Sequence, residues 1–257
     1  MSDEIKHECG LATIRLRKPL SYIKEKYGTV MFGLNKMYLL MEKQHNRGQD
    51  GAGLAVVKLD MAPGTPYMHR IRSNVQQPIA DIFATIGNDV KELEKYQSDL
   101  LQHPGFAKGH IPYIGELMLG HLRYGTQGRN LVEFCHPFVQ RDLTPSRNLA
   151  LAGNFNLINV DELNQMVNAE LTELEKNSDL KAMLNVIHHF LVIEDEKNPN
   201  TPDIAAVLKQ ATIHFDGGYN IGGLVGNGYS FIMRVANGIR PSYYYIHERY
   251  IVSVWER

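Results

Sequence analysis

The sequence predicts an antiparallel α+β fold in which two packed β-sheets have helices on their outer sides. Strand-like segments gather towards both ends of the chain, and helical segments are grouped between them. Strands and helices do not alternate regularly, as they would in a doubly wound parallel sheet. With 257 residues, of which 44% are hydrophobic and 21% charged, the chain can bury a sizeable core.

The strands are predicted from apolar residues that alternate with other residues, a period typical of strands with one buried face. This pattern occurs near residues 10–16, 52–59, 67–72, 115–124, 148–158, 218–225, 229–235 and 243–254. Strands therefore dominate the two ends of the chain.

Four helices are predicted from apolar residues three and four positions apart, which lie on one face of a helix. The four sets are Leu34, Met37, Tyr38 and Met41; Ile79, Ile82, Phe83 and Ile86; Leu180, Met183, Leu184 and Ile187; and Ile204, Val207, Leu208 and Ala211. The last helix has Thr201 as a candidate cap and Pro202 in its first turn. Polar stretches between the elements are typical of surface loops rather than linkers, so no internal domain boundary is predicted.

The charge and the N-terminal residues exclude several classes of protein. A formal net charge of -1 gives no broad basic field, so neither nucleic acid nor a membrane is an expected partner. The first eight residues are polar and acidic, unlike a secretory signal, and no run of about 18 apolar residues occurs. A cytoplasmic location is therefore the default expectation.

Metal sites and disulfide frameworks are not expected either. The two cysteines, Cys9 and Cys135, are too few for a disulfide framework and lack the paired spacing of a zinc site. His188 and His189 are adjacent on a predicted helix, so their side chains point about 100° apart and cannot easily share one ion. Core and surface histidines are therefore the expected interpretation.

Cys9 stands at the start of the first predicted strand. An isolated cysteine is most often a small buried hydrophobe, whereas nucleophilic chemistry needs a thiolate and a nearby base. A cysteine at a new N-terminus would carry that base itself, because an α-amino group titrates near pH 8 and lies close to its own sulfur.

Three further segments combine glycines with polar residues, at 47–53, 120–126 and 152–156. Each alone is typical of a turn or bulge. Together with Cys9 they resemble class II glutamine amidotransferase domains, most closely the N-terminal half of amidophosphoribosyltransferases, over nearly the whole chain. The matching segments are residues 8–10, 44–50, 120–126, 154 and 156, 178–179, and 238–241.

The resemblance implies an αββα N-terminal-nucleophile hydrolase fold and a glutaminase that supplies ammonia for purine nucleotide synthesis. Residues 1–8 resemble a short propeptide, removed by self-catalysed cleavage, and the mature domain would be 9–257. Cys9 would then attack the side-chain amide of glutamine. Asn154 and the backbone N–H of Phe155 would stabilise the oxyanion.

The resemblance also implies the residues that bind the substrate. Arg123 would form a bidentate pair with the α-carboxylate of glutamine, which its planar fork matches better than a lysine would. Asp179, at the first turn of a helix, would pair with the α-ammonium group, although an ordinary helix cap is the other interpretation. Tyr124 and Thr126 complete the predicted substrate site. No metal and no cofactor are expected in this chain.

The sequence departs from the family pattern in three places. Phe155 replaces a glycine, and a positive φ there would be strained for phenylalanine. Residues 234–238 lose the acid and proline of the Arg-Asp-Pro-x-Gly run, and 254–256 read Val-Trp-Glu where Ala-Ser-Glu is usual. Cys135 precedes the family's Pro-Phe loop end and is predicted to be structural.

The ammonia-accepting half is expected to be absent. We find no strand ending in paired acidic residues with the glycine- and threonine-containing loop of a phosphoribosyltransferase. The chain stops directly after a strand-like run, as a fragment of a longer protein would, so a phosphoribosyltransferase domain in cis or trans is the expected partner. Self-association into a homo-oligomer is left open.

Two alternatives to this active glutaminase remain. One is an inactive or regulatory remnant that binds glutamine, and the other is the glutaminase domain of a different class II amidotransferase, which feeds ammonia to a sugar phosphate or to aspartate.

Overall fold

The chain forms two compact units. The computed structural model describes residues 8–125, 131–168, 170–172, 175–176, 178–236 and 241–255. The first unit comprises Met1–Pro137 and Ser242–Arg257, and the second comprises Phe138–Pro241. No boundary was predicted from the sequence, because the chain has no linker-like segment. Each unit nevertheless has its own sheet and its own hydrophobic core.

The first unit contains a six-stranded antiparallel sheet with the strand order β3-β2-β4-β1-β10-β9. Its strands are β1 (Gly10–Leu16), β2 (Gly51–Val57), β3 (Met68–Ser73), β4 (Leu117–Arg123), β9 (Tyr243–Ile246) and β10 (Tyr250–Val254). β1 pairs with β4 on one side and with β10 on the other. The N-terminal strand is therefore held inside the sheet.

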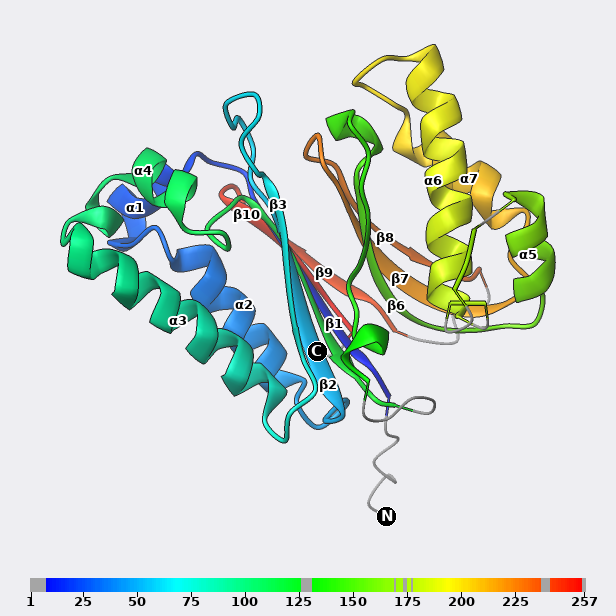
Figure 1. Cartoon of the computed structure of the whole chain (residues 1–257), viewed down its shortest axis with the longest axis horizontal. Helices are drawn as coiled ribbons and strands as arrows, with labels where there is room; N and C mark the ends of the chain where they lie inside the picture. Colours follow the sequence, from blue (N-terminus) through cyan, green and yellow to red (C-terminus); the bar gives the residue numbers. More distant parts are fainter. Residues whose placement is uncertain are drawn as a thin grey trace. The chain divides into compact units, whose positions relative to one another are not determined.

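Helices cover one face of this sheet (Figure 1). They are α1 (Leu20–Tyr27), α2 (Phe32–Lys43), α3 (Pro78–Tyr96) and α4 (Pro104–His110), with a short 3₁₀ turn at Leu100–Gln102. A second 3₁₀ turn of this unit, Val132–Phe134, is not among these helices. The predicted apolar stripes face the sheet: Met37 of α2 and Ile82 of α3 are fully buried with Leu54 of β2. Each such side chain contributes about 1.5–3 kcal/mol when it leaves water.

The second unit contains a four-stranded antiparallel sheet with the order β5-β6-β7-β8. Its elements are β5 (Phe138–Gln140), the 3₁₀ turn η3 (Pro145–Arg147), β6 (Leu149–Leu157), α5 (Val160–Met166), α6 (Asp179–Lys197), α7 (Ile204–Thr212), β7 (Gly217–Val225) and β8 (Ser230–Arg234). Figure 1 shows α6 and α7 on one face of this sheet. Leu184 and Val207 from these helices are buried with Leu151 and Ile221 from the strands.

The predicted α+β class with antiparallel sheets is confirmed, and the four predicted helices correspond to α2, α3, α6 and α7. Short elements were missed: β5, α1, α4 and α5. Their signals are weak, because α4 buries only Ala107 and α5 only Leu163. The single strand predicted over 243–254 is a hairpin of β9 and β10.

The start of α7 corrects the predicted cap. The helix begins at Ile204, and the side chain of Asp203 accepts hydrogen bonds from the backbone N–H groups of Ala205 (2.9 Å) and Ala206 (3.1 Å). Thr201 and Pro202 lie before the helix. A carboxylate is a strong N-terminal cap because it also complements the helix dipole.

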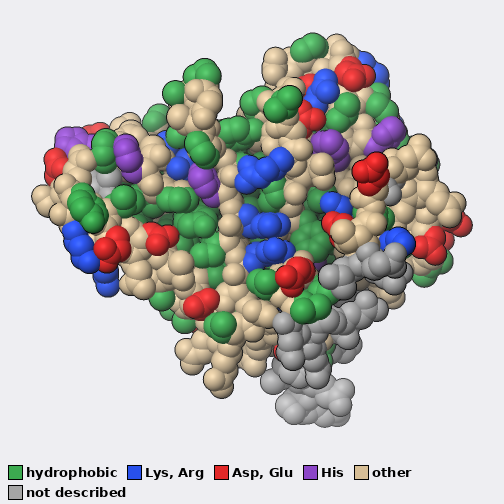
Figure 2. All heavy atoms as spheres, in the orientation of Figure 1, with side chains coloured by type: hydrophobic (Ala, Val, Ile, Leu, Met, Phe, Trp, Pro, Cys, Tyr) green, Lys and Arg blue, Asp and Glu red, His purple; other side chains and the backbone are tan. Residues whose placement is uncertain are grey.

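Figure 2 shows acidic side chains at separate places on the face drawn and several basic side chains in a row near its middle. Within the part of the chain that the structure describes, no helix has the length and apolar character needed to cross a membrane.

Candidate active-site residues

Cys9 lies directly before β1, beside the end of β4. Gly10 pairs with Leu122 in the register of these two strands. The half-buried Cys9 places its Sγ 4.0 Å from the backbone oxygen of Tyr124, a residue 115 positions away in the sequence. The sheet thus brings the predicted nucleophile to the segment that carries Arg123 and Tyr124.

Arg123 is the last residue of β4 and is 6% exposed. Its guanidinium carbon lies 5.8 Å from the ring centre of Phe134. Gly125 leaves room for this side chain, since a Cβ there would lie 3.3 Å from the guanidinium carbon. Arg123 is therefore held at the strand end next to Cys9. Thr126, the other predicted substrate residue of this segment, lies outside the described residues.

The segment 44–50, for which the sequence suggested no individual roles, supports both strand ends. The side chain of Gln44 accepts a hydrogen bond from the backbone N–H of Leu11 (3.3 Å) and donates one to the backbone oxygen of Leu40 (3.1 Å). Gln44 is 2% exposed. It therefore ties the start of β1 to the C-terminal part of α2.

Asp50 and Gly48 fix the same segment to the end of β4. The backbone N–H of Asp50 donates to the Arg123 oxygen (3.0 Å), and its carboxylate accepts from the Gly125 N–H (2.8 Å). A Cβ on Gly48 would lie 2.7 Å from the backbone of Arg123, so only glycine permits this approach.

Arg47 contacts the residues around the predicted cleavage point. Its Nη2 lies 2.7 Å from a carboxylate oxygen of Glu8, and its Nε donates to the backbone oxygen of Cys9 at 3.3 Å. Residues 1–7 of the predicted propeptide lie outside the described residues. Arg47 lies in the segment 44–50 that resembles the amidotransferase domains. Its contacts with Glu8 and Cys9 could not be predicted from the sequence, because they join residues 39 and 38 positions apart.

Cys135 has different surroundings from Cys9. Its side chain is fully buried, its thiol donates to the backbone oxygen of Ser73 (3.6 Å), and a Cβ on Gly51 would lie 2.5 Å from its sulfur. Burial raises the pKa of the Cys135 thiol above its ordinary value, although the nearby Arg123 guanidinium opposes this. An enclosed, protonated thiol is a poor nucleophile, in agreement with a structural role.

The predicted oxyanion residues lie in the second unit, on β6. Asn154 pairs with Asn220 and Phe155 pairs with Tyr219 in the register with β7. Phe155 has ordinary strand geometry; among the described residues, a positive φ outside glycine occurs only at Asp60, Asn168 and Asn200. The expected backbone strain at Phe155 is therefore absent, and its ring packs against the core of this unit.

Asp179 begins α6 and is tied to the same strand. Its carboxylate accepts a hydrogen bond from the backbone N–H of Leu157 (2.9 Å), while Ser178 caps the helix by accepting from Lys181 N–H (3.3 Å). Burial raises the pKa of Asp179 above its ordinary value of 3.8. The second unit thus holds Asp179 at the end of the strand that carries Asn154.

Asn220 was missed by the sequence analysis. It is fully buried on β7, and its side-chain amide donates to the backbone oxygen of Pro241 (3.2 Å). An asparagine inside an otherwise apolar and glycine-rich strand was the available signal. The matching segment 238–241 lies outside the described residues except for Pro241.

Other features do not add to this site. Two surface cavities, of about 430 Å³ in the second unit and about 370 Å³ in the first, are lined by none of the predicted site residues. Burial lowers the pKa of His188 on α6, whereas His189 is exposed. Among the described residues, no three histidine, cysteine or acidic side chains are grouped to hold a metal.

The chain is similar to known proteins over most of its length. An amidophosphoribosyltransferase from Pseudomonas aeruginosa is 28% identical over 184 residues, which cover 66% of this chain and 36% of that protein. The solved structure of an allosteric regulatory enzyme of purine biosynthesis has a TM-score of 0.64 at 19% identity, covering 96% of this chain and 42% of that chain. No family model matches the sequence.

A second solved structure, the glutamine phosphoribosylpyrophosphate amidotransferase from B. subtilis in complex with ADP and GMP, has a TM-score of 0.58 at 20% identity. It also covers 96% of this chain and 42% of its own. The chain therefore spans well under half the length of these proteins. Together, these comparisons show that the chain is similar to amidophosphoribosyltransferases over most of its length and shares the fold of the solved structures.

Proposed function

We propose that this domain hydrolyses glutamine to glutamate and ammonia, with Cys9 as the nucleophile after removal of residues 1–8. The observation that carries the proposal is the position of Cys9. Its half-buried thiol lies beside the end of β4, 4.0 Å from the backbone oxygen of Tyr124. Tyr124 directly follows the buried Arg123 in the sequence. Once freed, the α-amino group of Cys9 would itself serve as the base, because such groups titrate near pH 8. No second side chain would then be needed as the base.

The reaction follows from these groups. The sulfur of Cys9 attacks the side-chain amide carbon of glutamine, and its proton passes through the α-amino group to the departing nitrogen, which leaves as ammonia. The resulting thioester is hydrolysed by water, so that glutamate leaves and the thiol is restored. One water molecule is consumed in each turnover, and no cofactor takes part.

The roles proposed for the second unit derive from the family resemblance. Asn154 and the Phe155 N–H would donate to the oxyanion of the tetrahedral intermediate, where loss of one donor typically costs about 10²–10³ in rate. Asp179 would pair with the α-ammonium group of glutamine, and Arg123, Tyr124 and Thr126 would hold the carboxylate end.

We further propose that the ammonia serves a phosphoribosyltransferase partner, in cis or in trans, in purine nucleotide synthesis. The relative from Pseudomonas aeruginosa carries that activity in its name, and this chain covers 36% of its length. The remaining length of that relative is where such a partner domain would lie.

The intact mass of the protein, before and after incubation with an electrophilic glutamine analogue, tests the nucleophile. We expect loss of residues 1–8 and one covalent adduct, and neither event in Cys9→Ala. Cys135→Ala is the matched control and should be labelled like the wild type, because that thiol is enclosed. Labelling that persists in Cys9→Ala would refute the mechanism, and an unlabelled but processed wild type would favour an inactive remnant.

Arg123→Lys tests the carboxylate site. Lysine keeps the charge but loses the bidentate fork, so we expect KM for glutamine to rise by about tenfold or more with a smaller change in kcat. Arg249→Lys, which alters contacts to Glu248 and Tyr27 instead, is the control. An unchanged KM in Arg123→Lys would rule out this role.

The ionisation of Asp179 gives a pH-dependent test. Pairing with the α-ammonium of glutamine needs the carboxylate form, and burial raises the pKa of Asp179 above 3.8. As the solution is acidified, KM should therefore begin to rise at a higher pH than it would if Asp179 had an ordinary pKa. In Asp179→Asn we expect a high KM that no longer changes over this range; an acid limb retained in that variant would assign it to another group.

A further inference from the structure

Arg47 holds both residues that flank the peptide bond to be cut. Its Nη2 pairs with the Glu8 carboxylate at 2.7 Å, on the leader side, and its Nε donates to the Cys9 oxygen at 3.3 Å, on the mature side. The guanidinium is planar and rigid. Two contacts from one such group fix Glu8 and Cys9 relative to each other.

Hydrogen bonds fix the backbone segment that carries Arg47. Its backbone N–H donates to the oxygen of Gln44 (2.9 Å), whose side chain holds the start of β1 through Leu11. Three residues further on, Asp50 is bound to the end of β4 at the backbone of Arg123. The position of the guanidinium is therefore set by the same strands that position Cys9.

Fold stability alone does not explain the Arg47–Glu8 pair. The side chains are 19% and 26% exposed, and ion pairs that water can reach contribute little to stability. Glu8 also belongs to the segment that the proposed maturation removes. A contact that is discarded after cleavage can act only before it.

We propose that Arg47 is a positioning residue for removal of residues 1–8, which it aligns through the acidic side chain of Glu8. This inference rests on the proposed function of Cys9. In the step, the Cys9 sulfur attacks the Glu8 carbonyl carbon, the carbon–nitrogen bond breaks, and the sulfur's proton passes to the freed amine. Water then hydrolyses the thioester and releases residues 1–8 with a new C-terminal carboxylate on Glu8.

The two contacts of Arg47 exist at different stages: the contact with Glu8 only before cleavage, and the contact with Cys9 also after it. Before cleavage, both Glu8 and Arg47 should affect the rate of processing. After cleavage Glu8 is gone, while the Cys9 oxygen remains within reach of Arg47. Processing should therefore depend on both residues, and glutamine turnover by the mature chain on Arg47 alone.

A double-mutant cycle on the processing rate tests the proposal, with intact mass followed over time for wild type, Glu8→Gln, Arg47→Lys and the double variant. A salt bridge that water can reach typically corresponds to an effect of a few-fold, so each single variant should be processed about two- to fivefold more slowly. The double variant should be no slower than the slower single one, because both changes remove one contact. Arg249→Lys should be processed like wild type.

Three results would overturn the proposal: wild-type rates in Glu8→Gln, fully multiplicative effects in the double variant, or no processing of purified wild-type chain. Because Arg47→Lys could also loosen the fold, its thermal unfolding midpoint is measured alongside, and Glu8→Gln alone keeps the test decisive if that midpoint falls.

A chain that begins Met-Cys9, from which the initiator methionine is removed in the cell, separates this inference from the proposed function. If the shortened chain hydrolyses glutamine but the full-length chain is not processed, the role of Arg47 is refuted and the glutaminase is retained. An inactive Met-Cys9 chain would refute the glutaminase. If both proposals hold, Arg47→Lys lowers turnover in this shortened chain.

Discussion

Two arginine–carboxylate pairs, one in each unit, have nearly the same length and very different surroundings. Arg47 and Glu8 are 2.7 Å apart in the first unit, and Arg147 and Asp195 are 2.8 Å apart in the second. The side chain of Glu8 is 26% exposed, whereas that of Asp195 is 3% exposed. Distance alone therefore does not distinguish them, but burial does.

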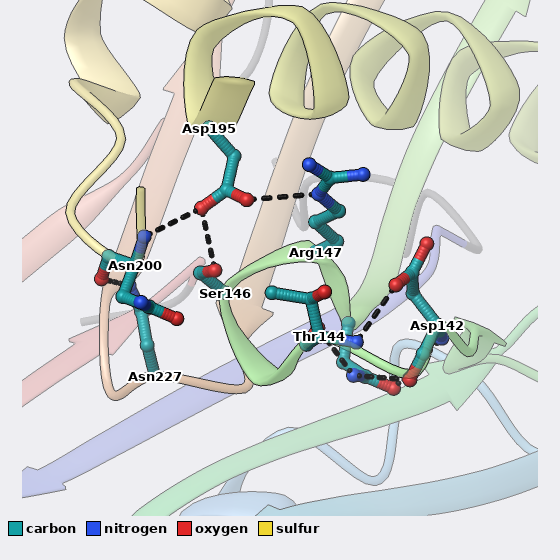
Figure 3. Close-up of polar contacts among 8 residues, drawn as sticks. Asp142, Thr144, Ser146, Arg147, Asp195, Asn200 and Asn227 are labelled. Atoms are coloured by element: carbon teal, nitrogen blue, oxygen red, sulfur yellow. Dashed lines mark hydrogen bonds and ion pairs between the residues drawn. The ribbon is translucent and has the colours of Figure 1, made fainter. Parts of the chain in front are cut away.

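The buried carboxylate of Asp195 is surrounded by donors (Figure 3). Besides the Arg147 guanidinium, it accepts from the hydroxyl of Ser146 (2.5 Å) and from the backbone N–H of Asn200 (3.0 Å). The oxygen of Asn200 in turn accepts from the side chain of Asn227 at 3.0 Å. One carboxylate thereby joins η3, the C-terminal part of α6 and the loop that follows it.

The difference shows how the same chemical pair can serve stability or alignment. A carboxylate removed from water must be fully hydrogen-bonded, so the Asp195 cluster holds only if its members keep their places. The Glu8 carboxylate remains partly hydrated and can leave with the leader at little cost to the fold. We expect Asp195 to matter for folding and Glu8 for maturation.

The largest effect should come from Asp195→Ala. It leaves the fully buried Ser146 hydroxyl without its acceptor, a loss that typically costs about 1–3 kcal/mol. Urea unfolding followed by circular dichroism measures the loss. A cost below about 1 kcal/mol would show that the cluster is no more important than a surface ion pair, and the contrast with Glu8 would disappear.

Lowering the pH should weaken the stabilisation by the same cluster, with a smaller change in unfolding free energy than Asp195→Ala causes. Burial alone would raise the pKa of Asp195, but the hydrogen bonds from Ser146 and Arg147 outweigh it and hold the pKa below its ordinary value of 3.8. A depressed folded-state pKa contributes stability that is present above the unfolded-state pKa and lost as pH falls through the folded-state value. The difference in unfolding free energy between wild type and Asp195→Asn should therefore be constant near neutral pH and shrink below about pH 4. A difference that stays constant down to pH 2 would contradict this account.

The sequence predicted the elements whose signals are long and local. The stripes around Met37, Ile82 and Leu184 indicated helices because each repeats over several turns, and all three residues are buried. Helices α1 and α5 bury too few side chains to produce such a stripe. The turn between β9 and β10 contains neither glycine nor proline, so the hairpin looked like one strand.

The candidate site was predicted from motifs, and its contacts were not. Cys9 and Arg123 stood out by their segments, but their placement at neighbouring strand ends depends on pairing between β1 and β4. Ser146 and Asp195 are 49 positions apart and belong to no periodic pattern. Contacts of this range follow from tertiary packing, which local periodicity does not encode.

The smallest effect, and the sharpest contrast, should come from Glu8→Gln in a Cys9→Ala background, where residues 1–8 stay attached to both proteins. The substitution removes a charge from a pair as short as that of Asp195. Since the Glu8 side chain is 26% exposed, we expect the unfolding free energy to change by less than about 0.5 kcal/mol. Urea unfolding at neutral pH, beside Asp195→Asn in the same background, measures both. If Glu8→Gln lowered the unfolding free energy as much as Asp195→Asn does, the Glu8 side chain would stabilise the fold. Removal of residues 1–8 would then destabilise the mature protein, which would contradict the role of Glu8 in a segment that is cleaved off.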